Sequence, residues 1–231
     1  LMKRLLFILF LQYIFPAIIY IPQDYTTIQE GINNASNGDT LIIGRGLYEE
    51  SLVISNMTLI LHSNYLSTLS NSDITLTTLS SLSDPALSLY NSEITLIGFS
   101  IAANQTGVYL EDSSIYLDKI IIFNAYHQGH AINLNNSSLS ASQSTLYGFD
   151  YSINSDINSS ITVNSSILWP YGQIINSMPS NGGSYIRYSC IKDDNYTITM
   201  DNNITSYPFI EFSLDIFNPW AEWELEFEDY P

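Results

Sequence analysis

A repeat of roughly twenty residues through the middle of the chain constrains its fold more than any other feature. Segments 87–96, 108–117 and 132–141 align without gaps. Each contains two apolar residues at positions i and i+2, a polar corner, and a second such pair seven residues after the first. Alternation with a period of two in such short segments is typical of strands. A repeat of this length predicts a solenoid whose coils stack on their neighbours.

The spacing of the second apolar pair along the chain predicts where each coil lies. The pairs fall at Met57/Leu59, Ile74/Leu76, Ile94/Leu96, Ile115/Leu117, Leu139/Ala141 and Ile161/Val163. Five residues after each of the last four pairs comes a further apolar residue: Ile101, Ile122, Leu146 and Leu168. This pattern predicts an all-β solenoid with three short strands per coil, and about 4.8 Å between neighbouring strands.

The corners of the repeat are rich in Asn, Asp and Ser, and they fall at Asn91-Ser92, Asp112-Ser113, Asn136-Ser137 and Asn158-Ser159. These side chains bond to nearby backbone and therefore suit turns. Stacked polar side chains can also bond to one another along a solenoid. We expect these corners to be structural rather than ligand-binding.

The segment before the repeats predicts one short helix. Thr26-Thr-Ile-Gln29 has the form of a capping box, and apolar residues at helical spacing follow it. We expect a helix over residues 27–35 that covers one open end of the stack, because an uncovered strand edge promotes aggregation. Strands are expected at residues 40–43, 52–54 and 57–61, and Gly44 and Gly46 mark a loop between the first two.

Two consecutive segments carry a resemblance to a known family. Residues 21–32 (IPQDYTTIQEGI) and 37–49 (NGDTLIIGRGLYE) resemble the opening of exported right-handed parallel β-helix proteins of the pectin-lyase-like superfamily. The resemblance extends over residues 19–212, including 166–169, 188–191 and 203–210. It implies a right-handed coil, an N-terminal helix that caps the first coil, and a bacterial exported protein.

The two ends of the chain differ from the repeats. Lys3 and Arg4 precede the apolar run from Leu5 to Ala17, which is too short to span a bilayer comfortably. We therefore predict a signal peptide at residues 1–19, with a retained membrane anchor as the alternative, and a secreted or cell-surface β-helix at residues 20–212. Residues 213–231 end in alternating Glu and aromatic or aliphatic residues, which predicts a strand that covers the last coil or continues into a longer protein.

Charge and cysteine content exclude several classes of partner. The chain has 6 Lys and Arg against 23 Asp and Glu, and its formal net charge is −17. Such a surface repels phosphate backbones, so nucleic acid is not expected to bind. It also disfavours polyanions such as pectin or alginate unless cations intervene. The single Cys190 cannot form an internal disulfide, and we expect it to be a small buried side chain.

Catalysis in the manner of the resembled family has few candidate residues here. A Ca²⁺-dependent lyase needs clustered carboxylates and a base. The weak candidates are Glu93, Glu111, Asp112, Asp118 and His130. Register along the repeats stacks Glu111 on Tyr90 and Asp112 on Asn91, which yields one acidic corner rather than a ladder. No cofactor is expected, with Ca²⁺ only under the lyase alternative, and the His127/His130 pair is expected to be solvated rather than metal-binding.

Surface aromatic residues are the remaining functional signal. Tyr109 and Tyr116 fall at outward positions of one coil, and tyrosines on a solenoid flank can stack on sugar rings. Shielding of strand edges by a good strand former is the simpler role. We predict a non-catalytic protein that binds carbohydrate or contacts surfaces. The alternatives are a polysaccharide lyase or glycoside hydrolase, which needs two suitably placed carboxylates, and a structural spacer of a longer surface protein.

Overall fold

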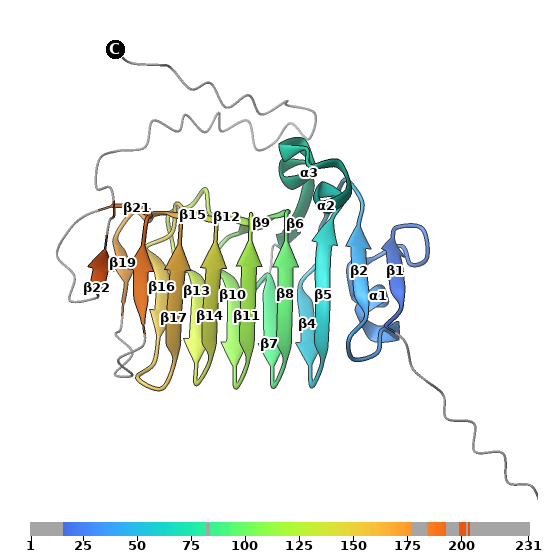
Figure 1. The fold of residues 1–231 in the computed structure, drawn as a ribbon, viewed down its shortest axis with the longest axis horizontal. Helices are drawn as coiled ribbons and strands as arrows, with labels where there is room; N and C mark the ends of the chain where they lie inside the picture. The colour runs from blue at the N-terminus through green and yellow to red at the C-terminus, as the bar shows by residue number, and fades with distance from the viewer. Residues whose placement is uncertain (1–15, 82–83, 177–183, 193–198, 202, 204–231) are drawn as a thin grey trace, which may run out of the picture.

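The computed structural model describes residues 16–81, 84–176, 184–192, 199–201 and 203. These residues form a β-solenoid built from three parallel sheets (Figure 1). The nine-stranded sheet contains, in spatial order, β1 (Ile18–Ile21), β2 (Thr40–Ile43), β5 (Thr58–Ser63), β8 (Glu93–Ile97), β11 (Ser114–Asp118), β14 (Ser138–Ser142), β17 (Ser160–Asn164), β20 (Tyr185–Arg187) and β22 (Thr199–Asp201).

The other two sheets complete each coil. The six-stranded sheet contains β4 (Leu52–Ser55), β7 (Leu87–Tyr90), β10 (Thr106–Glu111), β13 (His130–Asn135), β16 (Tyr151–Ser155) and β19 (Gln173–Ile175). The seven-stranded sheet contains β3 (Gly46–Tyr48), β6 (Thr77–Ser81), β9 (Ser100–Ala103), β12 (Ile121–Phe123), β15 (Thr145–Tyr147), β18 (Ile167–Trp169) and β21 (Cys190–Ile191). Three strands per coil and the right-handed parallel β-helix are therefore confirmed.

The apolar pairs of the repeat form the core, as predicted for the four regular coils. Ile94, Ile115, Leu139 and Ile161 are successive partners in the nine-stranded sheet, and all four side chains are buried. The third-strand residues Ile101, Ile122, Leu146 and Leu168 stack in the same way in the seven-stranded sheet. Each coil therefore buries its apolar face against its neighbours, which is how a solenoid is stabilised.

The first two predicted pairs are wrong. Leu59 and Leu61, not Met57 and Leu59, align with Ile94 and Leu96. The pair at Ile74/Leu76 is not a strand, because Ile74 lies in a helix and Leu76 at its C-terminal cap. The short helices α2 (Tyr65–Thr68) and α3 (Asn71–Thr75) are inserted between β5 and β6, and β5 pairs directly with β8. The strand β3 also occupies residues that were expected to be loop, where it pairs with β6.

The predicted N-terminal helix is α1 (Ile28–Asn34), and its cap lies one residue later than expected. Thr27, not Thr26, is the N-cap, and its hydroxyl accepts a hydrogen bond from the amide of Glu30. Gln29 instead pairs with the first strand of the six-stranded sheet. Its side-chain amide donates to the Val53 carbonyl at 3.1 Å, and its side-chain oxygen accepts from the Val53 amide at 2.8 Å. The helix thus covers a sheet edge with a side chain that satisfies the exposed strand.

The predicted end segments stay largely untested. Residues 1–15 and 204–231 lie outside the described residues, and so does the strand predicted within residues 213–231. The strand β1 begins at Ile18, inside the predicted signal peptide, and its Ile19 side chain is buried. Cleavage before Ile18 would therefore keep the first strand intact. Among the described residues, no helix has the length and apolar character needed to cross a bilayer.

Candidate functional site

The corner that joins each strand of the six-stranded sheet to the next strand of the nine-stranded sheet has an unusual backbone. Its leading residues Asn56, Asn91, Asp112 and Asn136 have φ angles of 57°, 46°, 49° and 47°. Asn and Asp are the non-glycine residues that best tolerate this left-handed region. Backbone geometry therefore explains why these four corners start with Asn or Asp. The four residues stack from coil to coil, and we call them the corner row.

The serines that follow three of these residues, Ser92, Ser113 and Ser137, are structural, as is Ser159 in the next coil. The Ser92 amide donates to Ser113 Oγ, the Ser113 amide to Ser137 Oγ, and the Ser137 amide to Ser159 Oγ, each at 3.0 Å. The Ser113 hydroxyl in turn donates to the Glu111 carbonyl at 2.7 Å. All four serines are buried, so each coil satisfies a backbone amide of its neighbour with a side chain rather than with water. The structural role predicted for the corners holds for the serines.

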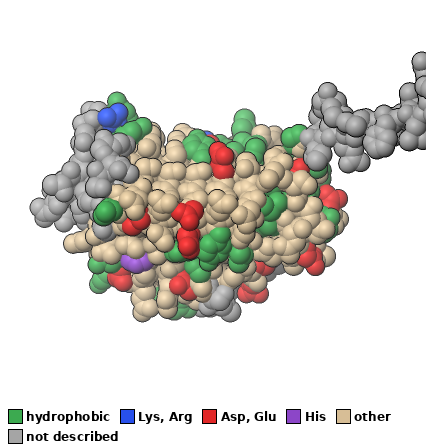
Figure 2. Space-filling model, turned by 90° about the horizontal axis from the view of Figure 1, so that it is seen from below, with side chains coloured by type: hydrophobic (Ala, Val, Ile, Leu, Met, Phe, Trp, Pro, Cys, Tyr) green, Lys and Arg blue, Asp and Glu red, His purple; other side chains and the backbone are tan. Residues whose placement is uncertain are grey.

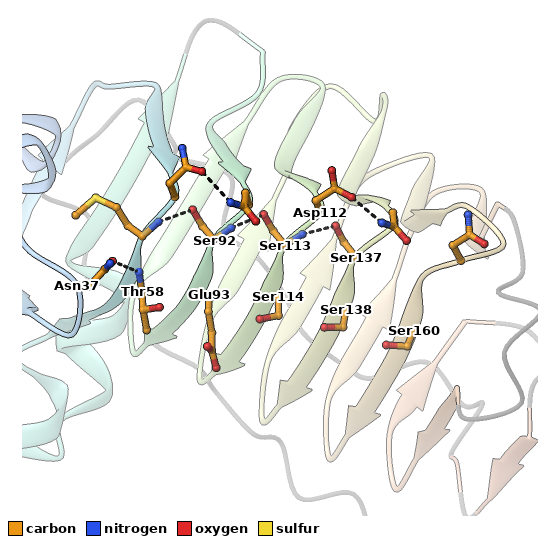
Figure 3. Close-up of a pocket in the computed structure, with 15 residues that line it drawn as sticks. Asn37, Thr58, Ser92, Glu93, Asp112, Ser113, Ser114, Ser137, Ser138 and Ser160 are labelled. Atoms are coloured by element: carbon orange, nitrogen blue, oxygen red, sulfur yellow. Dashed lines mark hydrogen bonds between the residues drawn. The ribbon is translucent and has the colours of Figure 1, made fainter.

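The corner row itself is exposed and makes fewer bonds. The Asn91 side-chain amide donates to Asn56 Oδ1 at 2.8 Å, and the Asn136 side-chain amide donates to Asp112 Oδ1 at 2.6 Å. Figure 3 shows these two pairs above the line of serines. Each of these side chains has further donors or acceptors to offer. The Asn and Asp residues of the corner therefore present polar groups outward, at the repeat distance of the coils.

A shallow polar groove of about 570 Å³ follows this corner across several coils. Its second wall is formed by the first residues of five strands in the nine-stranded sheet, which we call the strand-start row: Thr58, Glu93, Ser114, Ser138 and Ser160. Figure 3 shows these side chains projecting from successive strands to the same side. Seen from below in Figure 2, this side of the molecule is mostly uncharged polar surface with isolated acidic and hydrophobic patches.

The groove continues onto the outer face of the nine-stranded sheet. A second depression of about 260 Å³ shares Glu93, Ser114, Ser138 and Ser160 with the groove. Tyr116 lines this depression, and 41% of its surface is exposed. The two depressions together form one surface, which we call the corner groove. It combines hydroxyl, amide and carboxylate groups with one exposed aromatic ring.

The two tyrosines predicted to bind ligand lie on different sheets. Tyr109 is in β10 of the six-stranded sheet, whereas Tyr116 is in β11 of the nine-stranded sheet. They do not share one flat flank, but they precede and follow the same corner of the coil. Tyr109 has a neighbour that the sequence reasoning missed, because the Tyr90 ring lies 6.0 Å from its ring. Aromatic rings therefore border the corner groove on both sides.

Three of the predicted acidic residues meet at this corner. Glu93 and Asp112 both line the groove, and Glu111 immediately precedes Asp112 at the end of β10. The Tyr109 hydroxyl donates to Glu111 Oε2 at 3.1 Å. Burial, with the nearby Glu111 charge, raises the pKa of Tyr109. The predicted stacking of Glu111 on Tyr90 is confirmed by the strand register.

The other two candidates lie elsewhere. Asp118 ends β11, about 13 Å along the strand from Ser114, and it pairs with Lys119 at 3.3 Å. His130 begins β13, at the opposite end of that strand from the groove. Its ring lies 5.3 Å from that of Tyr151. Burial lowers the pKa of His130, although the charges of Asp150 and Asp84 act in the opposite direction.

The described residues offer no metal centre. Among them, no three His, Cys, Asp or Glu side chains group closely enough to hold an ion. His127 stacks on the Tyr171 ring at 5.0 Å, apart from the His130–Tyr151 contact. None of the described residues that line the corner groove is Lys or Arg. Cys190 is partly exposed on the seven-stranded sheet rather than fully buried as predicted, and its partial burial raises its pKa.

Comparisons with known proteins identify the fold. No protein-family model and no curated protein matches the chain. The structure is similar to the crystal structure of alginate lyase from Paenibacillus sp. str. FPU-7, with a TM-score of 0.51 and 14% identity over 76% of this chain and 66% of the lyase. It is also similar to pectin methylesterase from Aspergillus niger, with a TM-score of 0.45 and 13% identity over 82% of this chain and 84% of the esterase.

The chain thus spans just under two thirds of the length of the lyase. At these identities the similarity concerns the fold alone. It agrees with the β-helix fold that the N-terminal segment and the coils predict.

Proposed function

We propose that this protein binds an uncharged polysaccharide along the corner groove without cleaving it. The observation that carries the proposal is the corner groove itself, which places two rows of polar side chains next to exposed aromatic rings. Sugar rings present hydroxyl groups at their edges and C–H groups on their faces. Ser and Asn side chains can bond to the edges, and Tyr116 or Tyr90 can stack on a face.

The charge of the groove favours an uncharged ligand. Glu93 and Asp112 line it, Glu111 lies beside it, and no described basic residue does. A uronic acid polymer would bring further negative charge next to these carboxylates, and like charges repel at such short range. The structurally similar lyase and methylesterase are named for alginate and pectin, both polyanions. We therefore propose that this chain shares their architecture and takes a different class of glycan.

The same groove bears on the enzymatic alternative. Glu93 and Asp112 come from successive coils and line one groove, which is the minimum a glycoside hydrolase requires. Asp112, however, accepts a hydrogen bond from Asn136 as part of the corner row. The base that a lyase needs is missing from the described lining, because His130 and Lys119 lie away from it. These placements support binding over cleavage.

The place of action follows from the N-terminal sequence and is also a proposal. The basic residues Lys3 and Arg4 and the apolar run to Ala17 support export. We propose a secreted or cell-surface protein whose partner is a polysaccharide of the cell surface or its surroundings. The spacer alternative, in which the coils only extend a longer surface protein, predicts no glycan binding at all.

Affinity electrophoresis tests the proposal. The purified protein is run through gels that contain β-glucan, xylan, mannan, alginate or pectin, with and without Ca²⁺. We expect retention by at least one uncharged glycan, none by alginate or pectin, and no new reducing ends or unsaturated products. Retention by alginate or pectin alone would contradict the proposed ligand class. Released products would replace it with the enzymatic alternative.

Matched tyrosine variants locate the binding site. Tyr116→Ala removes the exposed ring of the corner groove, and we expect affinity to fall ~10-fold, as for loss of one stacked ring. Tyr126→Ala removes an even more exposed ring at a different corner and should leave affinity unchanged. Tyr109→Phe keeps the ring and removes the hydroxyl with its bonds to Glu111 and Asn135, so it should have a smaller effect than Tyr116→Ala. Equal losses in Tyr116→Ala and Tyr126→Ala would place binding outside the groove.

A further inference from the structure

The outer face of the seven-stranded sheet carries an aromatic row. Phe123, Tyr147 and Trp169 are register partners in β12, β15 and β18. Their neighbours Ile122, Leu146 and Leu168 point into the core, so alternation directs the three rings outward. Each of the three is partly exposed. A second outward row of Ile121, Thr145 and Ile167 runs beside them. This face is thus more apolar and aromatic than an ordinary solvated sheet face.

Basic residues gather at the borders of this face, next to acidic residues such as Asp73, Asp118 and the Glu49–Glu50 pair after β3. None of the seven strands contains Asp or Glu, although the chain has 23 acidic residues. All four basic residues of the described chain border the sheet. Arg45 precedes β3, Lys119 lies just before β12, Arg187 lies just before β21, and Lys192 directly follows it.

Arg187 lies over the Tyr185 ring, 4.3 Å from its centroid, and two of the other cations have carboxylate partners. Arg45 pairs with Asp73 at 2.6 Å and Lys119 with Asp118 at 3.3 Å. Lys192 instead donates to the backbone carbonyls of Pro170 and Tyr171, at 3.1 Å and 2.5 Å. It follows Trp169 in the outward row, because Leu168 pairs with Ile191. The end of the aromatic row therefore holds a cation bound only to neutral oxygens among the described residues.

We propose that the chain's own residues 220–229 bind to this face. The segment reads WAEWELEFED, in which Glu222, Glu224, Glu226 and Glu228 alternate with Trp223, Leu225 and Phe227. As a strand it has one apolar and one acidic side. The apolar side complements the aromatic row, and the carboxylates complement the cations at the borders of the sheet.

The connection is long enough for this contact. Asn203 is the last described residue, and 16 residues lie between it and Trp220, which makes 17 Cα–Cα steps. Such a connection spans up to ~56 Å when extended. Seven strands at about 4.8 Å spacing cover only about 29 Å of the sheet. The segment can therefore reach any part of the seven-stranded face from the last coil.

Tryptophan fluorescence of the full chain tests the contact. The chain has three tryptophans, Trp169, Trp220 and Trp223, so the variant Trp169→Phe keeps an aromatic row and leaves only the two reporters in the segment. We expect blue-shifted emission and weak acrylamide quenching relative to the same protein unfolded in guanidinium chloride. Emission and quenching equal to those of the unfolded chain would overturn the proposal.

Variants within the segment keep the test independent of folding. On the Trp169→Phe background, Leu225→Ser with Phe227→Ser should shift the emission to the red and raise quenching to the unfolded value. Leu214→Ser with Phe217→Ser changes the same residue types outside the segment and should leave both readings unchanged. On the sheet, Tyr147→Ser should have the effect of the segment variant, whereas Tyr116→Ser on the nine-stranded sheet should not. Equal effects within either pair would contradict the proposed contact.

Dilution separates the contact within one chain from the contact between chains. The proposal predicts quenching that is independent of protein concentration. Quenching that rises as the protein is diluted would show that the segment binds a second copy, and would overturn the intramolecular contact. Because the charged borders contribute, quenching should also rise with salt at fixed concentration.

Discussion

The regular coils from β8 to β19 and the coils before them differ in the length of chain between one corner and the next, although both stack through bonds at the same corner. In the regular part, corner serines bond from coil to coil at intervals of 21, 24 and 22 residues. Before it, the interval between the corner residues Asn56 and Asn91 is 35 residues, and the extra chain forms α2 and α3. Both corner residues keep the left-handed backbone and still bond to each other.

This difference shows which part of a coil is fixed and which is free. The corner between the six- and nine-stranded sheets continues unchanged across the insertion, because its bonds join neighbouring coils directly. The passage from the nine- to the seven-stranded sheet contains thirteen residues here, 64–76, where the next coil has only residues 98–99, and the stack is not broken. The candidate site lies on the invariant corner, so we expect substitutions there and in the regular core to cost far more than substitutions in the insertion.

The largest expected effect is at Gly148. Its φ is +82°, and a Cβ atom there would lie 2.2 Å from the Asn124 carbonyl oxygen of the neighbouring coil. Gly148→Ala should lower the free energy of unfolding by at least about 4 kcal/mol, measured by urea denaturation. Gly38→Ala is the matched change before the regular coils, with φ of +91° and the nearest atom 3.8 Å away. It should cost only about 1–2 kcal/mol. Similar costs would show that backbone strain, not coil stacking, sets the effect.

Removal of a core side chain should separate the two regions next. Leu117 is fully buried between the partner strands of two regular coils. Leu117→Ala should lower the free energy of unfolding by about 2–5 kcal/mol. Leu66→Ala in α2, where 46% of the side chain is exposed, should change it by less than about 0.5 kcal/mol. A large loss from Leu66→Ala would mean that the insertion is part of the cooperative core.

The serine bonds of the corner should have an intermediate effect. Ser113→Ala leaves the buried Ser92 amide without its acceptor, and it should cost about 1–3 kcal/mol in chemical denaturation. Ser70→Ala removes a partly exposed hydroxyl of the insertion, which bonds to the exposed Ser72 hydroxyl, and should be nearly neutral. If Ser113→Ala were also neutral, water would replace the serine, and the corner would not be the fixed element.

The smallest expected effect depends on pH and is local to the insertion. Burial alone would raise the pKa of Asp73, but hydrogen bonds from Arg45 and Thr68 and the Arg45 charge outweigh it and lower that pKa. The stabilisation is therefore fully present above the unfolded pKa of about 3.9 and is lost as pH falls through the folded value. Asp73→Asn should cost about 1 kcal/mol at neutral pH, because half-exposed Arg45 is screened.

Hydrogen exchange resolves this effect by region. At neutral pH, Asp73→Asn should speed exchange in residues 65–75 and leave residues 93–164 unchanged. The difference between the two proteins should shrink as the pH is lowered below 4. A uniform change along the chain would instead tie the insertion to the stability of the regular coils.

How much the sequence predicts follows the same division. Ile94, Ile115, Leu139 and Ile161 recur at nearly constant intervals, so alternation places their strands correctly. Ile74 fits the same alternation but lies in a helix. A short apolar pair cannot distinguish a strand from one helical turn, and only the direct pairing of β5 with β8 resolves it.

The candidate site was predictable only in part. The repeat places Glu111 and Asp112 at the corner. Register between neighbouring coils pairs Glu93 with Ser114, the first residue of the strand that follows this corner. Whether Tyr109 and Tyr116 share a face depends on the bend between them, which alternation cannot give. The corner asparagines and serines are both small polar residues, and sequence alone does not distinguish their roles. The left-handed backbone directs the asparagines outward and buries the serines. Three-dimensional register is what separates the buried, structural half of the corner from the half that faces outward.

Chemical-shift mapping with the glycan that the electrophoresis selects tests the central claim most directly. An oligosaccharide of that glycan is titrated into isotope-labelled protein, and amide shifts are followed by NMR. We predict saturable shifts concentrated in residues 91–95, 112–116 and 136–140, which form the corner groove and its continuation onto the nine-stranded sheet. Shifts concentrated in residues 121–125, 145–149 and 167–171, around the aromatic row of the seven-stranded sheet, would contradict the account.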